Sequence, residues 1–180
     1  MMKFLLTYWI GIAFFFGIFY WEESPFSLLI NHLQTDVTTY LTALTLPTSM
    51  MTGTHISISS YYSLVIEKAC NGMIPYLFFL ASIVAFPSTI SHKIKWAIVA
   101  YLIIITMNTF RIWIVTQLVM QEQSNFSLAH DYIGNALLIS TGLILFVLFV
   151  KSRGCRQVKK TSQSQISHII PQSEPILATI

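Results

Sequence analysis

Residues 96–119 read WAIVAYLIIITMNTFRIWIVTQLV, a hydrophobic run that contains a single charged residue, Arg111. Such a run is typical of a membrane-spanning helix, because about 20 apolar residues are needed to cross the hydrocarbon core of a bilayer. A charged side chain inside a span is costly and by default marks a functional site. The stretch therefore predicts a membrane protein and makes Arg111 the first candidate functional residue.

The composition of the whole chain supports this interpretation. Of the 180 residues, 54% are hydrophobic and only 9% are charged, and the mean hydropathy is +0.67. Soluble domains carry about 25% charged residues. No run alternates as a membrane β-strand does, so we expect the spans to be helices. The net charge of +3 does not indicate a nucleic-acid partner, because most basic residues flank the hydrophobic runs.

Three further hydrophobic runs, at residues 4–21, 73–86 and 133–150, predict a bundle of about four membrane-spanning helices. The first run lacks a small-x-small cleavage site and is long for a secretory signal, so we expect a retained helix. Residues 1–150 are thus predicted to form one membrane-embedded domain. Residues 151–180 begin with basic residues and become rich in Ser and Gln, which indicates a mostly disordered cytoplasmic tail.

Two segments between the first and second runs are expected to lie outside the bilayer core. Residues 25–46 place apolar side chains at helical spacing among many polar ones, which favours an amphipathic helix on the membrane surface. A helix packed against the bundle is the open alternative. Residues 55–59 alternate in polarity and residues 62–66 are β-branched and aromatic, so a short outer hairpin is expected there.

The Lys and Arg residues predict the orientation. All but two of the ten fall on one side of a four-span topology, and the positive-inside rule makes this side the cytoplasm. We therefore expect a multi-pass protein of the inner, cytoplasmic membrane with both termini inside. The exceptions are Arg111, inside a span, and Lys68, two residues before Cys70. The residues on the expected inner side are Lys3, Lys93, Lys95, Lys151, Arg153, Arg156, Lys159 and Lys160.

This topology gathers three reactive residues near the outer interface. Cys70 lies at the outer end of the second span, and His130 precedes the fourth. Arg111 lies about 12 Å below the outer end of the third span, a depth that a long side chain partly recovers. The second cysteine, Cys155, falls on the opposite side, so no intramolecular disulfide is expected.

The three residue types suit acyl transfer through a thioester. The start of a helix favours the thiolate form of Cys70, the nucleophilic form of cysteine. His130 could exchange protons with the thiol or with a leaving amine, and Arg111 could stabilise an oxyanion. The structural alternatives are a packed cysteine, a solvated histidine and an arginine that pairs with Glu122 or Asp131.

Other polar residues near these three could support them. The Asn residues inside the spans could orient Arg111 and His130, although hydrogen bonding between helices alone is the alternative. No HExxH or CxxC motif occurs, so we expect neither a metal site nor a cofactor. The expected supporting residues are Asn71, Gly72, Asn108 and Asp131.

Three short segments resemble the motifs of the exosortase/archaeosortase family, in the same order and at span ends. They are ACNGM at 69–73, NTFRI at 108–112 and AHDYIGN at 129–135, and the resemblance covers about residues 56–150. It implies a membrane cysteine protease or transpeptidase that processes C-terminal sorting signals of exported proteins. Such signals combine a short motif, a hydrophobic span and a basic cluster.

The resemblance also implies residue roles. Cys70 would be the nucleophile, Arg111 would stabilise the transition state, and His130 would be the general acid or base. The chain departs from the family in reading Cys-Asn-Gly where many members read Cys-Ser-Gly, and it has fewer spans than the longer exosortases, as a compact subtype would. A non-enzymatic membrane scaffold or assembly factor is the alternative function, and a transporter is disfavoured by the small number of spans.

Overall fold

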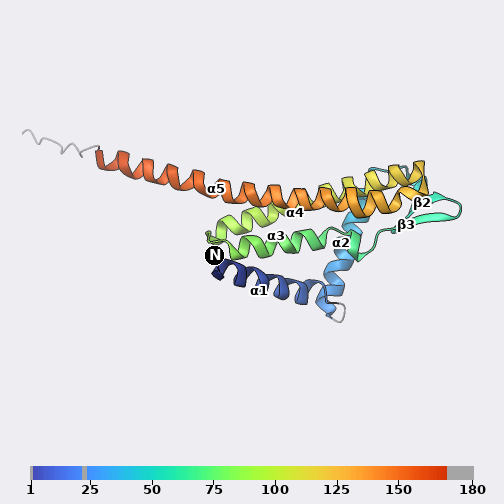
Figure 1. The fold of residues 1–180 in the computed structure, drawn as a ribbon, viewed down its shortest axis with the longest axis horizontal. Coiled ribbons are helices and arrows are strands. Elements are labelled where there is room, and N and C mark those ends of the chain that lie inside the picture. The colour runs from blue at the N-terminus through green and yellow to red at the C-terminus, as the bar shows by residue number, and fades with distance from the viewer. Residues whose placement is uncertain (1, 22–23, 170–180) are drawn as a thin grey trace, which may run out of the picture.

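The computed structural model describes the backbone of residues 2–21 and 24–169, with side chains as far as Ser152. Four helices lie alongside one another, and a fifth crosses them near one end, next to a small sheet (Figure 1). The α-helices are α1 (Met2–Phe19), α2 (Pro25–Ala43), α3 (Met73–Ala85), α4 (Ile90–Gln121) and α5 (Asn135–Ile169). The strands are β1 (Met51–Thr52), β2 (His55–Ser59) and β3 (Tyr62–Val65).

The predicted all-α membrane class is confirmed. Three helical stretches are long and apolar enough to cross a bilayer, namely Met2–Phe19, Ile90–Gln121 and Gln123–Ser152. Helix α3 is a shorter apolar helix that packs between the other three. Each of the four hydrophobic runs in the sequence is thus a helix of the bundle.

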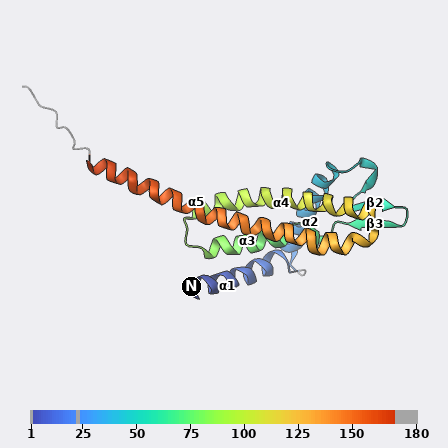
Figure 2. The same ribbon diagram turned by 45° about the horizontal axis from the view of Figure 1, so that its top comes forward.

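Both chain ends of the bundle lie on the same side. The start of α1, the turn between α3 and α4, and the extension of α5 share one end of the molecule, and the sheet lies at the other (Figures 1 and 2). This is the arrangement that an even number of crossings requires. That the shared end faces the cytoplasm stays a prediction from the basic residues.

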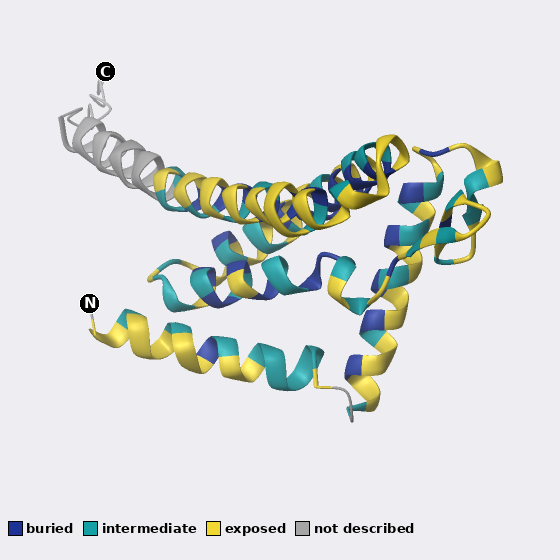
Figure 3. Cartoon of the chain, turned by 45° about the vertical axis from the view of Figure 1, so that its right-hand side comes forward, coloured by how far each residue is buried: buried dark blue, intermediate teal, exposed yellow. Residues whose placement is uncertain are grey.

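Helix α2 turns its polar side inward. Its buried residues are all polar, and most of its large apolar residues are exposed (Figure 3). The helix therefore packs on the bundle through polar contacts, and that its apolar face lies on the membrane surface stays a prediction. The buried set is Ser27, Asn31, Gln34, Thr38 and Thr42, and the exposed set includes Phe26, Leu29, Leu33 and Val37.

The expected hairpin is part of a three-stranded antiparallel sheet in the order β1-β2-β3. Ile56 on β2 pairs with Leu64 on β3, and both contact the bundle. Ile56 is almost fully buried in a cluster with Ile66 and with Ile112 of α4, which anchors the sheet to the bundle. The sequence did not predict β1, because two residues are too few to show a strand pattern.

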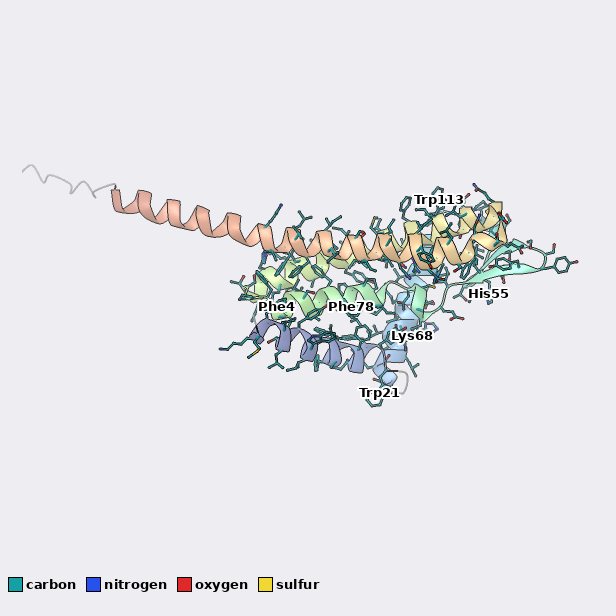
Figure 4. All side chains as sticks on the ribbon, viewed as in Figure 1. Phe4, Trp21, His55, Lys68, Phe78 and Trp113 are labelled. Atoms are coloured by element: carbon teal, nitrogen blue, oxygen red, sulfur yellow. The ribbon has the colours of Figure 1, made fainter. Side chains whose placement is uncertain are left out.

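Lys68, one of the two exceptions to the charge pattern, closes the end of α1. Its Nζ atom donates to the backbone oxygen of Tyr20 at 2.6 Å and lies 4.1 Å from the centre of the Tyr20 ring. Figure 4 shows Lys68 close to this end of α1. A cation is favourable at a helix C-terminus, where backbone carbonyls lack partners. This contact explains a basic residue on the expected outer side.

Two helix boundaries differ from expectation. The segment between the third and fourth hydrophobic runs is polar, and a loop is expected at residues 121–130, but most of it is helical. His130 lies in a π-helix, Leu128–Gly134, that leads directly into α5. Helix α5 then continues to Ile169, where the sequence predicted a mostly disordered tail from residue 151. No proline interrupts the chain between Asn135 and Pro171, so the backbone hydrogen bonds can continue past the span. Residues 170–180 lie outside the described residues, and the cytoplasmic location of the tail stays a prediction.

Candidate active site

Cys70 lies in a tight turn before α3. It ends a short 3-10 helix, Lys68–Cys70, and α3 begins three residues later at Met73. The side-chain oxygen of Asn71 accepts a hydrogen bond from the Met73 backbone N–H at 2.9 Å, which caps the helix. Gly72 has a φ of +79°, and an added Cβ there would lie 3.2 Å from the Asn108 side chain. The turn therefore uses the side chain of Asn71 and favours glycine at position 72.

Side chains from α2 and α4 hold the two backbone carbonyls of this turn. Asn108 Nδ2 donates to the Cys70 carbonyl at 2.8 Å. Gln34 Nε2 and Thr38 Oγ1 donate to the Asn71 carbonyl at 3.0 and 3.3 Å. The position of the Cys70 backbone is therefore fixed from two sides of the bundle.

The same polar network extends further along α2. Asn71 Nδ2 donates to Asn31 Oδ1 at 3.2 Å, and the Tyr101 hydroxyl donates to Gln34 Oε1 at 2.7 Å. Asn71 is fully buried, and Asn31 and Gln34 are nearly so. Buried amides are stable only when their hydrogen bonds are made, so these contacts explain why the polar side of α2 faces inward.

His130 lies beside the Cys70 thiol. Its Nε2 atom is 3.6 Å from Cys70 Sγ, and its Nδ1 atom is 2.9 Å from Asp131 Oδ1. The carboxylate also accepts a hydrogen bond from Ser127 Oγ at 2.9 Å. The ring of Phe126 stacks on the imidazole, with centroids 5.1 Å apart and planes 15° from parallel. These contacts set the plane and the direction of the imidazole.

Arg111 contacts the same imidazole nitrogen. Its Nη2 atom lies 3.0 Å from His130 Nε2 and 3.4 Å from Asn135 Oδ1. A guanidinium can only donate, so Nε2 must carry a lone pair and the proton must be on Nδ1. An ionised Asp131 beside Nδ1 requires the same tautomer. Two independent neighbours thus assign one form of His130, with its basic nitrogen toward the thiol.

The guanidinium is tightly enclosed but not fully hydrogen-bonded. Arg111 is 4% exposed, and its Nε atom has no hydrogen-bond partner among the described residues. An added Cβ at Gly134 would lie 2.6 Å from this Nε atom, so a larger residue there would displace the guanidinium. A buried N–H without a partner is costly, and because this one is closed to solvent, a substrate oxygen would reach it only after the guanidinium shifts.

The three residues line a common cavity of about 380 Å³ between β3, the turn at Cys70, helix α4 and the π-helix at Leu128–Gly134. Cys70, Arg111 and His130 lie on its walls, together with six consecutive residues at 62–67. Within the described part of the chain, no group of three or more His, Cys, Asp or Glu side chains could hold a metal ion.

The structure brings together every residue that the sequence predicted for the site. Cys70, Arg111 and His130 are in contact, and the supporting residues Asn71, Gly72, Asn108 and Asp131 all touch one of them or its turn. Sequence reasoning missed other residues that hold the site. They are Gln34, Thr38 and Phe126.

Comparison with known proteins gives one match. The sequence model of a family described as transmembrane exosortase matches residues 2–149. This range includes all the site residues described above. No curated protein and no solved structure matches the chain.

Proposed function

The chain belongs to the transmembrane exosortase family, and we propose that it is a membrane cysteine protease or transpeptidase with Cys70 as its nucleophile. The observation that carries the proposal is the 3.6 Å contact between Cys70 Sγ and His130 Nε2, with Arg111 on the same nitrogen. A thiol, a base oriented by a carboxylate, and a fixed cation form the arrangement that acyl transfer needs.

The first step forms a tetrahedral intermediate. The Cys70 thiol gives its proton to His130 Nε2 while Sγ bonds to the carbonyl carbon of the scissile peptide, and the carbonyl π electrons move to oxygen. Protonated Nε2 can no longer accept from Arg111, and two cations 3.0 Å apart repel each other. The guanidinium is therefore driven from His130 toward the new oxyanion, where both its charge and its free Nε–H are useful.

The second step releases the signal. The oxyanion re-forms its carbonyl, the carbon–nitrogen bond breaks, and His130 gives its Nε2 proton to the departing amine. The protein part of the substrate then remains on Cys70 as a thioester. An amine or water attacks the thioester carbon and gives a proton to His130 Nε2. The carbon–sulfur bond then breaks and His130 returns that proton to Cys70 Sγ, so that atoms and charge balance.

The expected substrates are exported proteins whose C-terminus carries a short motif, a hydrophobic span and a basic cluster. In the proposed orientation both termini are cytoplasmic and the site faces outward from the inner membrane. The basic cluster of a substrate would then lie on the same side as Lys3 and Lys151, where the positive-inside rule puts it. The lipid bilayer surrounds both proteins.

Replacing Cys70 tests the proposal directly. A substrate with a tripartite tail is co-expressed with the wild type, with Cys70→Ala, and with Cys155→Ala as the matched control. We expect Cys70→Ala to lose processing at normal abundance and Cys155→Ala to retain it. Processing by Cys70→Ala at the wild-type rate would instead favour a non-enzymatic scaffold or assembly factor.

A further inference from the structure

A second cavity meets the site from the membrane side. It has a volume of about 490 Å³ and lies between α3 and α5, with Tyr8 of α1 on its wall. Ala69 and Arg111 line both cavities, so the two meet beside Cys70. A single chain could therefore occupy both while one of its peptide bonds lies at the thiol.

The first cavity follows the free edge of β3. Side chains of a strand point alternately to opposite faces, yet residues 62–66 all line this cavity in succession. A cavity lined by side chains from both faces of a strand lies along the edge of that strand. The order β1-β2-β3 leaves this edge without a strand neighbour among the described residues.

The register shows which backbone groups face this edge. Ile66 N–H donates to the Thr54 carbonyl at 2.9 Å, and Val65 and Leu64 pair with His55 and Ile56. Hydrogen-bonded and non-hydrogen-bonded pairs alternate in an antiparallel ladder. Leu64 therefore bonds to β2 as Ile66 does, and the N–H and C=O of Val65 and Ser63 point to the free edge.

The second cavity has a different chemistry. Its lining is mostly apolar, and its polar residues are Tyr8, Ser82, Arg111 and Asn135. Phe78 of α3 lies on its wall and points toward α1, where its ring centre is 5.3 Å from that of Phe16 (Figure 4). Gly142 of α5 also lines the cavity, and an added Cβ there would meet no atom within 4 Å. This groove has room for apolar side chains.

We propose that the substrate binds across both cavities. An extended segment before the scissile bond adds to the free edge of β3, and the apolar helix after the bond lies in the groove between α3 and α5. This inference rests on the proposed function. β3 runs toward Cys70 and the bundle (Figure 1). The substrate segment runs the same way, because its scissile bond and its apolar helix follow it in sequence, so the added strand is parallel to β3.

The two cavities suit a peptide of this kind in this order. An extended segment needs partners for its backbone N–H and C=O groups, and the edge of β3 supplies them. An apolar helix satisfies its own backbone and needs only apolar contacts within the membrane. A lipid could fill the groove between α3 and α5, but it would not use the strand edge.

Proline at Val65 tests the strand pairing. Val65→Pro removes an N–H that faces the free edge and leaves the bonds from Leu64 and Ile66 to β2 intact. We expect about a tenfold or greater loss of processing. The substrate loses a backbone hydrogen bond, and the proline ring blocks its approach to the edge of β3. Val65→Ala keeps this N–H and should lose far less processing than Val65→Pro, so the difference between the two variants measures the backbone contribution. Unchanged maleimide labelling of Cys70 would show that the nucleophile is still in place.

Cross-linking tests the same pairing without proline. Val65→Cys is combined with Cys70→Ala and Cys155→Ala, and single cysteines are placed along the substrate before its scissile bond. Neighbouring strands bring side chains of the same face together, so disulfides should form at alternate substrate positions. Cross-links without this alternation would overturn the strand addition.

Bulk at Gly142 tests the groove. Gly142→Leu should fill the space meant for the substrate helix and lower processing about tenfold or more, by the loss of apolar contact. Gly17→Leu is the matched control, because Gly17 of α1 also has open space at its Cβ position but does not line the groove. Normal processing by Gly142→Leu would assign the groove to lipid and overturn the proposal.

These outcomes are separable from failure of the proposed function. If Cys70→Ala still processes substrate, the enzyme assignment itself is wrong. If Cys70→Ala is inactive while Val65→Pro or Gly142→Leu processes normally, the enzyme assignment holds and the binding path is wrong.

Discussion

Helices α3, α4 and α5 pack together at both ends of the bundle, but with opposite chemistry. At the end near the chain termini, Phe79, Ile104 and Phe149 form part of an apolar cluster that is closed to solvent. At the end near the sheet, the buried residues between the same helices include Asn71, Asn108 and Arg111. The end near the start of α1, which the basic residues predict to be the inner one, has the features of a stable core. The end near the sheet, predicted to be the outer one, has those of a functional site, and the two are called the inner and outer ends below on this expectation.

The difference shows what each end requires. In the apolar cluster the main determinant is volume, because a missing group leaves a cavity. At the outer end, stability depends mainly on the hydrogen-bond and charge partners of the buried polar groups. An unpaired buried amide or charge there costs more free energy than a lost apolar contact. Substitutions at the two ends should therefore affect different measurements, namely abundance and stability at the inner end and processing at the outer end.

The largest effect after Cys70→Ala is expected from Arg111→Lys. Lysine keeps the charge but loses the planar fork that reaches His130, Asn135 and the oxyanion together. We expect processing to fall about 100- to 1,000-fold, the usual result of losing an oxyanion donor, with little change in abundance. Processing near the wild-type rate would remove Arg111 from its proposed role.

Gly134→Ala should follow. The new methyl group would lie 2.6 Å from Arg111 Nε and would displace the guanidinium. A displacement of about 1 Å can cost about 100-fold in rate, so we expect a loss of that order. Gly17→Ala in α1 is the control, because Gly17 also has open space at its Cβ position and lines neither cavity. Equal processing by the two alanine variants would contradict the tight fit described here.

A smaller effect is expected from Gln34→Leu on α2. This change removes the donor to the Asn71 carbonyl and the acceptor of the Tyr101 hydroxyl, while Thr38 still holds the turn. One unpaired buried group costs about 1–3 kcal/mol, so processing should fall about tenfold. Leu29→Ala, on the exposed face of α2, should leave processing unchanged. Measured rates that rank these two variants in reverse would show that α2 contributes only its lipid-facing side.

The smallest effect on processing is expected from Phe149→Ala at the inner end. Phe149 is fully buried, and its removal should lower the free energy of unfolding by about 3–5 kcal/mol. Thermal unfolding in detergent would measure this loss. Processing normalised to protein abundance should stay close to wild type. A normalised loss as large as that of Gly134→Ala would show that the two ends are coupled.

Much of this arrangement could be predicted from the sequence. The hydrophobic runs marked the bundle helices because lipid selects apolar length, a property that needs no tertiary information. The site residues could be named because a cysteine, an intramembrane arginine and a histidine at span ends are chemically unusual in such a chain. The three motifs then agreed with the family that matches residues 2–149.

Other features could not be read from local patterns. The polar residues of α2 recur at helical spacing, but a two-faced helix does not reveal which face meets protein and which meets lipid. Only tertiary packing decides that Gln34 meets the Asn71 carbonyl. The π-helix at His130 is equally hidden, because Gly134 is required by the Arg111 side chain from another helix rather than by its own neighbours.

The short length of α3 has a consequence for the membrane itself. With 13 residues, the helix rises about 20 Å, roughly 10 Å less than the hydrocarbon core of a typical bilayer. The Cys70 turn at its start would then lie below the level of the outer headgroups, and the surrounding lipid would have to thin to expose it to water. Because of hydrophobic mismatch of this kind, the length of the lipid acyl chains affects how membrane proteins are distributed among membranes of different thickness. In the proposed mechanism, bilayer thickness therefore becomes part of the environment that determines how easily water or an amine reaches the thioester on Cys70.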